Sequence, residues 1–370
     1  MKVLFMTSGV RTIHRPLELH IRQGLEALGV DLVVYDLAYH LYYQGSALAR
    51  FKQEEEINLL NHGPLHRLAA APVLYELHRL KPDLLLCFQG SFIPPEVPRA
   101  ASDLGIPSAL WSVDDPYEVD LTTQYAGAYD LVFTVEAAAV PFYREALGVE
   151  AHYLPLGCNP DFHRPTEVPE RYRSDVCFVG SAFYNRLELV DQMADYLLES
   201  GLTIRILGQW WDQLKRYNRL HRFIDNAGVT PQEAIRYYCG ARINLNLHRA
   251  PDATAYVSAN LKGLQAKSPN NRTFEIAACG AFQLVEQPAN LGQAFTVGEE
   301  LDGFDGPAEL VTKIEHYRRH DEQRRAMAER ARERAAREHS YAARLRTVLE
   351  TAAEYRAGRR AKSIAGGHRP

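Results

Sequence analysis

The sequence predicts an α/β protein built from two doubly wound, parallel-sheet domains, one in each half of the chain. Short apolar runs alternate with longer amphipathic stretches over most of the 370 residues, and strand–helix alternation of this kind produces parallel sheets covered by helices. A segment rich in proline and glycine (154–173) interrupts the alternation, which then resumes. Such a segment is typical of a linker, so we expect two domains.

Ten apolar runs are the candidate strands. In the first half they are residues 2–7, 31–36, 83–89, 108–114, 131–135 and 152–156, and in the second half 175–180, 203–208, 242–247 and 282–286. Each run is continuous rather than alternating, as in strands that are buried on both faces. Between the first two runs, residues 16–28 place four apolar side chains on one stripe of a helix, namely Leu17, Ile21, Leu25 and Leu28.

These runs predict an N-terminal Rossmann-like domain over residues 1–160 and a second over 161–330. Residues 331–370 are predicted to form a C-terminal helix that packs back toward the N-terminal domain, with a disordered tail at 362–370. Open α/β sheets bind ligands beyond the carboxyl ends of their strands, so a cleft between the domains is the expected site.

Composition excludes several classes of protein. The net charge of −4 gives no indication of a polyanionic partner. The arginine-rich helical region from about residue 308 has two interpretations, a nucleic-acid arm or a solvated helix face, and its interspersed glutamates favour the second. No segment approaches the ~20 apolar residues that span a bilayer.

The five cysteines are scattered, odd in number and never spaced as C-x-x-C. This pattern argues against a disulfide framework and against a structural zinc site. We therefore expect free thiols and a cytoplasmic location.

The stretch NNRTFEIAACGAFQLVE (270–286) predicts a helix that begins with an anion site. Ser268 and Pro269 favour a helix start, and Gly280 suits a left-handed helix end. The first turn then presents Asn270, Asn271 and Arg272 around unpaired backbone N–H groups at the positive end of the helix dipole.

Glu275 follows Arg272 by one turn on the same face of this helix. A carboxylate there can accept hydrogen bonds from both hydroxyls of a ribose while the helix end and Arg272 hold a diphosphate. The alternative is a simple surface ion pair between Arg272 and Glu275, since such i,i+3 pairs are common.

Two glycines follow predicted strands in a way that suits phosphate binding. Gly180 with Ser181 ends the strand 175–180, and its lack of a side chain lets backbone N–H groups approach a pyrophosphate. A plain tight turn is an equally good interpretation. Gly9, in TSGVRT (7–12), has the same place after the first strand.

Asp114 and Asp115, in WSVDDPY (111–117), follow a strand at the edge where a first-domain residue faces the expected cleft. A carboxylate there can deprotonate an acceptor hydroxyl, and Asp114 is our candidate base, with His14 as another. Asp115 is either a second candidate or a turn residue before Pro116. We reject a metal pair at these aspartates, because helix dipole and arginines in the second domain can replace a cation.

Six stretches resemble the GT-B glycosyltransferases, specifically the spore-maturation CgeB-like group of family-1/4-type enzymes. They are FEIAACGAFQLVE (274–286), DVCFVGSAFYNR (175–186), TIRILGQWW (203–211), VTPQEAIRYYCGARINLNLHR (229–249), WSVDDPY (111–117) and LPLGCNPDFHRP (154–165). The resemblance covers nearly the whole chain and is more pronounced in the second half.

This resemblance implies two Rossmann-like domains that face each other across a cleft, with a nucleotide-sugar donor on the second. It implies that Glu275 binds the ribose and that Gly180, Ser181 and Arg186 border the diphosphate. It also implies that the loop after Gly208 lies near the base and that His248 and Arg249 lie beside the sugar.

One position departs from the family's pattern. Many retaining relatives carry a second glutamate eight positions before the ribose-binding one, and here that position is Lys267. Because that glutamate contacts the donor sugar, its absence leaves both the sugar and the stereochemistry open.

The expected activity is a hexosyl transfer from a UDP- or dTDP-linked sugar to a hydroxyl acceptor (a glycan, a protein or a small molecule). We expect no metal and no cofactor besides this co-substrate. Two alternatives are a nucleotide-sugar 2-epimerase of the same fold and a non-catalytic protein that binds nucleotide sugars. Trp210 and Trp211 can stack on a base or cover the sheet, and residues 251–267 are expected to form an active-site flap.

Overall fold

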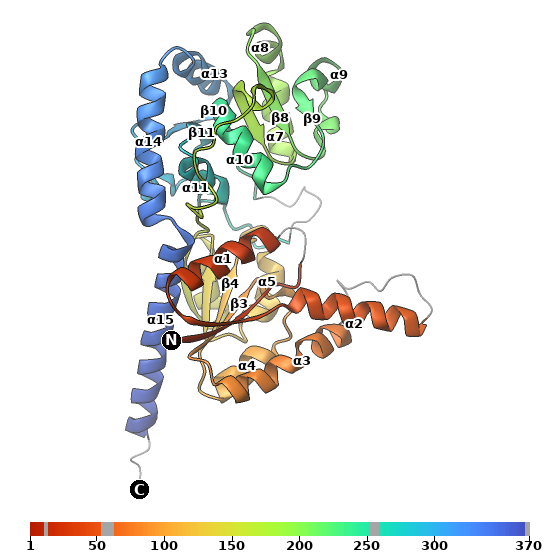
Figure 1. Ribbon diagram of the computed structural model, residues 1–370, viewed down its shortest axis with the longest axis vertical. Coiled ribbons are helices and arrows are strands. Elements are labelled where there is room, and N and C mark those ends of the chain that lie inside the picture. The colour runs from red at the N-terminus through yellow and green to blue at the C-terminus, as the bar shows by residue number, and fades with distance from the viewer. Residues whose placement is uncertain (11–13, 53–62, 252–258, 367–370) are drawn as a thin grey trace. The chain divides into compact units, whose positions relative to one another are not determined.

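The structure is a computed structural model and describes residues 1–10, 14–52, 63–251 and 259–366 (Figure 1). The chain forms two compact units. Unit 1 comprises Met1–Leu154, Ala259–Leu264 and Tyr341–Pro370, and unit 2 comprises Pro155–Ser258 and Gln265–Ser340. Within the described residues, no helix combines the length and the apolar character that crossing a membrane requires.

Unit 1 is built on a six-stranded, fully parallel sheet in the order β2-β1-β3-β4-β5-β6. The strands are β1 (Lys2–Met6), β2 (Asp31–Tyr35), β3 (Leu84–Phe88), β4 (Ser108–Ser112), β5 (Leu131–Thr134) and β6 (Glu150–Tyr153). All five residues of β3 and of β4 are buried, which explains why these strands are continuous apolar runs.

Helices cover both faces of this sheet. On one face lie α2 (Leu37–Lys52), α3 (Gly63–Leu80), α4 (Glu96–Asp103), α5 (Val119–Ala126) and α6 (Ala139–Leu147). Two further helices, α1 (Arg15–Ala27) and α15 (Tyr341–Gly366), contact each other (Figure 1). A Cβ atom on Gly24 would lie 2.7 Å from Leu345, so α1 and α15 pack closely because this residue is glycine.

Unit 2 repeats the design with a second parallel sheet in the order β12-β11-β10-β7-β8-β9. Its strands are β7 (Ser174–Val179), β8 (Ile204–Leu207), β9 (Ile224–Asp225), β10 (Ala241–Asn246), β11 (Gln283–Glu286) and β12 (Asp302–Phe304). The two parallel sheets confirm the predicted fold class. The edge strands β9 and β12 were not predicted, because segments this short carry no apolar run.

The helices of unit 2 also lie on two faces. α7 (Tyr184–Gln192), α8 (Ala194–Glu199), α9 (Tyr217–Leu220) and α13 (Gly306–Tyr317) share one core with the sheet. α10 (Pro231–Gly240) and α11 (Asn271–Ala278) belong to other clusters, and α12 (Leu291–Ala294) packs with α11. The described residues also contain four short 3₁₀ helices: η2 (Gly90–Phe92), η3 (Glu170–Tyr172), η4 (Trp211–Gln213) and η5 (His221–Phe223).

The C-terminal region differs from the expected single helix over residues 331–370. α14 (Asp321–Glu338) contacts α11 in unit 2, whereas α15 belongs to unit 1. Several arginines of α14 pair with glutamates, such as Arg332 with Glu329 and Arg334 with Glu338. This is the solvated, ion-paired helix face that the sequence favoured. The helix α15 continues to Gly366, so the predicted tail at 362–370 begins too early.

Candidate functional site

Three parallel strands of unit 2 end at one edge of the sheet, and each is followed by a residue that we expected at the donor site. Gly180 follows β7, Gly208 follows β8, and His248 lies two residues after β10. The first turn of α11 belongs to the same edge, because the N–H of Asn270 donates to Nε2 of His248 at 3.2 Å. The structure therefore brings these elements together.

Neighbouring atoms lie so close to Gly180 and Gly208 that neither position has room for a Cβ atom. A Cβ atom on Gly208 would lie 2.2 Å from the carbonyl oxygen of Gly180, and one on Gly180 would lie 2.3 Å from Nη1 of Arg272. Contacts this short exclude a side chain at Gly208, where the obstacle is backbone. At Gly180, the missing side chain is what leaves room for the guanidinium of Arg272.

The guanidinium groups of Arg272 and Arg186 bridge the ends of β7 and β10. Arg272 donates to the carbonyls of Val179 at 2.7 Å and Leu247 at 2.9 Å. Arg186 donates to Leu247 at 2.9 Å and to Ser181 at 2.8 Å. Backbone carbonyls thus hold two positive charges at this edge of the sheet.

Burial and these two charges keep His248 neutral. The pKa of His248 is lowered to about 3, first by burial and then by Arg272 and Arg186. Since Nε2 accepts from the backbone of Asn270, the ring proton resides on Nδ1. Nδ1 is buried and has no hydrogen-bond partner among the described residues, so this N–H is a donor that a ligand oxygen can satisfy.

The helix α11 begins later than the sequence predicted. Its N-cap is Asn270, not Ser268, and the Asn270 side chain accepts from the N–H of Thr273 at 3.2 Å. The Asn270 amide also donates to Asn246, which donates in turn to Thr273 and Gln283. Because this network fixes the cap onto β10, asparagine is favoured over serine. At the other end, Gly280 is left-handed (φ 63) as predicted.

Glu275 lies one turn into α11 and is only 14% exposed. Its Oε1 accepts from the side-chain amide of Asn271 at 2.9 Å, which orients the carboxylate along the first turn. Nε2 of His163 lies 4.0 Å from the same oxygen, but burial lowers the pKa of His163 to about 4. His163 is therefore neutral near pH 7.

Arg249, Trp210 and Trp211 make different contacts near this edge of the sheet. The guanidinium of Arg249 lies 4.6 Å above the ring of Phe183. Trp211 is fully buried, and its indole N–H donates to the carbonyl of Gly180 at 3.0 Å. It therefore helps to hold the turn that follows β7. Trp210 is half-buried and contacts Phe183. Of the two interpretations of these tryptophans, covering the sheet fits Trp211.

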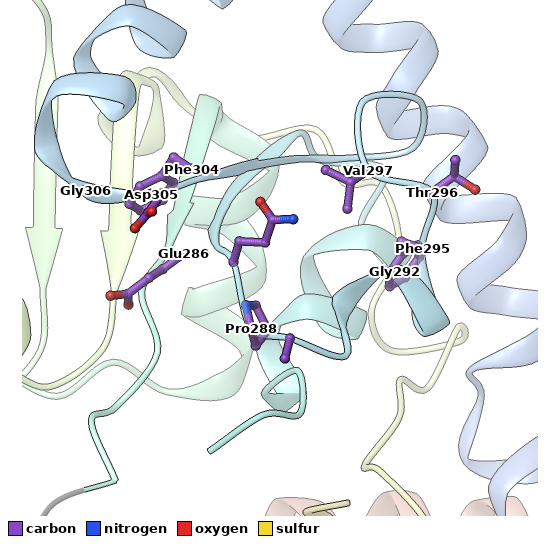
Figure 2. A pocket seen from close by; sticks show the side chains of 11 residues that line it. Glu286, Pro288, Gly292, Phe295, Thr296, Val297, Phe304, Asp305 and Gly306 are labelled. Carbon is purple, nitrogen blue, oxygen red and sulfur yellow. The ribbon is translucent and has the colours of Figure 1, made fainter. Parts of the chain in front are cut away.

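A cavity of about 850 Å³ opens beside this edge, between the ends of β11 and β12 (Figure 2). Figure 2 shows Glu286 and Asp305 on one side and Phe295 on the other. Glu286 accepts the backbone N–H of His248 at 2.8 Å, and burial raises the pKa of Glu286. One residue that lines the cavity, Glu286, is therefore hydrogen-bonded to the backbone of His248.

In unit 1, Asp114 and His14 form a pair. Nε2 of His14 lies 3.3 Å from Oδ2 of Asp114, whose side chain is 36% exposed while that of His14 is 8% exposed. Asp114 is thus the member that a ligand can reach. In the described part of the chain, no group of three or more histidine, cysteine, aspartate or glutamate side chains is arranged for a metal ion.

Asp115 lies elsewhere than a catalytic base should. Its carboxylate is buried and accepts hydrogen bonds from Thr134 at 2.7 Å and Tyr143 at 2.8 Å. Burial raises the pKa of Asp115 to about 6. We therefore do not retain Asp115 as a candidate base, because its oxygens are occupied inside the protein.

Two other expectations meet the structure only in part. Ser8 donates from its N–H and its hydroxyl to the buried Glu18, and Gly9 faces Leu41 and Phe92, so the TSG loop is packed rather than open. Of the expected flap at 251–267, residues 252–258 lie outside the described residues. Residues Ala259–Leu264 belong to unit 1, where the Asp120 N–H donates to Ala259 at 2.8 Å.

Sequence reasoning missed four residues of this edge: Asn246, Asn270 as a cap, His163 and Glu286. The signal was present for His163, which lies in the quoted LPLGCNPDFHRP stretch, but no role was assigned to it. Glu286 closes the strand 282–286, and only the sheet order reveals that it meets His248.

Comparison with known proteins agrees with this architecture. A family model described as glycosyl transferase-like matches residues 186–350. The glycosyltransferase from Rickettsia africae ESF-5 superposes with a TM-score of 0.62 at 12% identity, covering 96% of this chain and 98% of that one. Alr3699/HepE of Anabaena, solved in complex with UDP-glucose, gives 0.60 at 13% identity, covering 96% and 100%. The chain is a glycosyltransferase enzyme with the GT-B fold.

Within that class, the sequence comparison is more specific. The chain is 28% identical to Spore protein CgeB of Bacillus subtilis (strain 168) over 261 residues, which is 70% of this chain and 79% of CgeB. In sequence the chain is thus similar to CgeB over most of the length of both proteins.

Proposed function

We propose that this enzyme transfers a hexose from a UDP- or dTDP-linked sugar to a hydroxyl group of an acceptor. The observation that carries the proposal is the tip of α11, where Arg272, the Nδ1–H of His248 and the carboxylate of Glu275 share one edge of the sheet. The UDP and UDP-glucose complexes of the Anabaena relative support a uridine donor.

The donor site follows from the charges at this edge. The diphosphate lies at the N-terminus of α11 against Arg272, where the helix dipole and the guanidinium both favour negative charge. The N–H of His248 donates to a diphosphate or sugar oxygen. Arg186 and Arg249 add positive charge, and the glycines at 180 and 208 with Ser181 let backbone approach the ligand.

Glu275 accepts from the ribose hydroxyls while Asn271 holds its carboxylate in place. Departure of the nucleoside diphosphate leaves negative charge on the phosphates, and the fixed arginines stabilise that charge without reorganising. We propose that no metal is needed, because these arginines stabilise the negative charge on the leaving diphosphate as a metal ion would.

Asp114 is the proposed base for an inverting transfer. Its exposed carboxylate takes the proton of the acceptor hydroxyl, while His14 positions it from the buried side. A retaining transfer needs no such base, because the leaving oxygen of the donor can guide the attack.

A thermal-shift panel of UDP, dTDP, GDP and ADP tests the donor assignment. A ligand that binds only the folded protein raises its stability by about 2.7 kcal/mol at a hundred times Kd. We expect UDP or dTDP to raise Tm, Glu275→Ala to abolish the shift, and Glu188→Ala, on the exposed side of α7, to keep it. An unchanged shift in Glu275→Ala would remove the ribose assignment.

A turnover assay with UDP-sugars and an acceptor panel then tests the chemistry. We expect UDP release that depends on acceptor. Isomerised sugar without UDP release would indicate an epimerase, and affinity without turnover would indicate a binding protein.

The five free cysteines support a cytoplasmic location. Fractionation of cells that express a tagged full-length chain tests this, and recovery in an oxidising compartment would contradict it.

A further inference from the structure

Two cysteines of unit 2 meet at the C-terminal ends of neighbouring helices. Cys239 lies in the last turn of α10, and Cys279 is the C-cap of α11. The thiol of Cys239 donates to the carbonyl of Cys279 at 3.8 Å and to that of Arg164 at 3.7 Å, and the side chains of the two cysteines interact with each other. They are thus close enough to react with small movements of either side chain.

The two thiols differ in access. Cys239 is half-buried and lines a surface cavity of about 690 Å³, together with residues 166–169, Arg173 and Gly240. Cys279 is only 2% exposed and lies behind it. A small reagent from solvent therefore meets Cys239 first.

The two thiols also differ in pKa, and the more accessible one, Cys239, has the lower pKa. The thiol of Cys279 donates to Cys239 and lowers the pKa of Cys239, and a backbone N–H at Thr166 acts in the same direction. The pKa of Cys279 is raised well above its usual value, first because it donates this hydrogen bond and then because it is buried. Cys239 is therefore the more acidic thiol of the pair.

The other three cysteines lack these features. Burial raises the pKa of Cys87 and of Cys177 to about 12. Cys158 is fully buried, and its thiol points to the carbonyls of Ala335 and His339 at 3.5 Å each. An accessible thiol that lies beside a second thiol and has a lowered pKa is therefore a property of the 239–279 pair.

We propose that Cys239 and Cys279 form a reversible redox-modification site whose co-reactant is a hydroperoxide. The thiolate of Cys239 attacks the distal peroxide oxygen, the O–O bond breaks, and with one proton the products are a sulfenic acid and water or an alcohol. The thiol of Cys279 then attacks the sulfenic sulfur. An S–S bond forms, the S–O bond breaks, and the hydroxyl leaves as water with the Cys279 proton.

The resulting bond closes a loop of chain that contains β10 and α11. This loop carries Arg272 and Glu275, so oxidation fixes the C-terminal end of the helix on which both residues lie. Two-electron reduction by a dithiol returns both thiols.

Thiol counting on the full-length protein tests the site. The protein is treated with a small molar excess of hydrogen peroxide, quenched in acid, unfolded, alkylated with N-ethylmaleimide and weighed intact. We expect the number of alkylated cysteines to fall from five to three, peptide mapping to join Cys239 to Cys279, and dithiothreitol to restore five. Five alkylated cysteines after treatment, or a bridge between other cysteines, would overturn the proposal.

Single variants separate the two roles. Cys279→Ser should stop at the sulfenic acid of Cys239, which dimedone traps, and Cys239→Ser should keep its four thiols under the same treatment. Cys87→Ala, which alters a cysteine of unit 1, should still form the bond. Equal loss of thiols in Cys239→Ser would show that Cys239 is not the attacking residue. Circular dichroism of each variant checks that it is folded before treatment.

Discussion

Gly180 and Arg272 share one narrow space at the end of β7. A methyl group at position 180 would lie 2.3 Å from Nη1 of Arg272, so the guanidinium must move while the backbone stays. Gly180→Ala should therefore weaken UDP binding about 10-fold or more, the equivalent of one charge-assisted hydrogen bond. Isothermal titration calorimetry measures the affinity.

The matched control for this variant is Gly228→Ala. The nearest atom to a Cβ there is 3.9 Å away, in the same unit, so UDP affinity should not change. Equal affinities for the two variants would show that Arg272 does not contact the ligand.

Asp114 is the residue whose loss separates chemistry from donor binding. Asp114→Asn removes the proton acceptor and keeps the shape of the side chain, so kcat of an inverting enzyme should fall by about 10²–10⁴ with an unchanged thermal shift by UDP. Asp31→Asn, an exposed change in the same unit whose side chain is 66% exposed, should leave kcat intact. An unaltered kcat in Asp114→Asn would exclude it as a base.

Asp115 should show its buried character in the pH dependence of stability. Its pKa is about 6 when folded, against 3.8 for an unperturbed side chain. The folded state therefore favours the protonated form, and the stability that this form contributes is present below pH 3.8 and lost as pH rises to about 6. The full loss corresponds to about 3 kcal/mol.

Asp115→Asn cannot ionise, so the comparison with the parent protein isolates this effect. The free energy of unfolding of the variant, relative to the parent, should increase from pH 4 to pH 6 and then remain constant. Denaturant unfolding at several pH values measures it. A difference that does not vary with pH would mean that the carboxyl group is not buried as described.

At the scale of elements, the cap of α11 connects stability with ligand binding. Asn270→Ala loses the cap, which costs about 1 kcal/mol. It also removes the donor to Oδ1 of the buried Asn246, which costs about 1–3 kcal/mol more. The same change removes the side chain that fixes the first turn of α11, where we propose that the diphosphate binds. We expect a Tm lower by several degrees and weaker UDP binding.

Thr230→Ala is the control, since it removes the exposed capping box of α10 at a similar helix-capping cost. It should lower Tm without altering UDP affinity. Both are read from the same calorimetric series, and a parallel loss of affinity in Thr230→Ala would point to general destabilisation.

The elements also show how far sequence reasoning reaches. Ten of the twelve strands in the described residues were predicted because each lies in a continuous apolar run, even though the edge strands β2 and β6 are only partly buried. The strands β9 and β12 consist of two and three residues and carry no such pattern. The start of α11 was misplaced because Ser268 and Asn270 are both good caps, and the choice depends on Asn246, a residue of the neighbouring strand.

For the site, the sequence predicted the residues whose role follows from local position, such as Gly280 at the end of α11. It did not predict Glu286 or His163, because their partners lie far away in the chain: the N–H of His248 for one and Glu275 for the other. The sequence also offered both Asp114 and Asp115 as candidate bases. In the structure the side chain of Asp114 is 36% exposed, whereas that of Asp115 is buried.

At the scale of the molecule, the chain crosses between the units and returns. α15 belongs to unit 1 although α14 belongs to unit 2, so the C-terminal helix stabilises the N-terminal part of the chain. Leu345 is fully buried where α15 meets Gly24 of α1. Leu345→Ala should lower the stability of unit 1 by about 2–5 kcal/mol, whereas the exposed Thr347→Ala should change it by less than about 0.5 kcal/mol.

Because the proposed donor site lies in unit 2, Leu345→Ala should keep the UDP affinity of the parent protein at temperatures below its lowered Tm. Differential scanning calorimetry with and without UDP measures both quantities. Loss of UDP binding in the folded variant would mean that the site depends on α15.

The central claim is that the tip of α11 holds the diphosphate while Glu275 holds the ribose. A crystal structure of the full chain with UDP measures this directly. The account predicts diphosphate oxygens within about 3 Å of the guanidinium of Arg272 and of the N–H of His248, with both ribose hydroxyls on Glu275. A nucleotide bound with its diphosphate away from α11, or with its ribose away from Glu275, would contradict it.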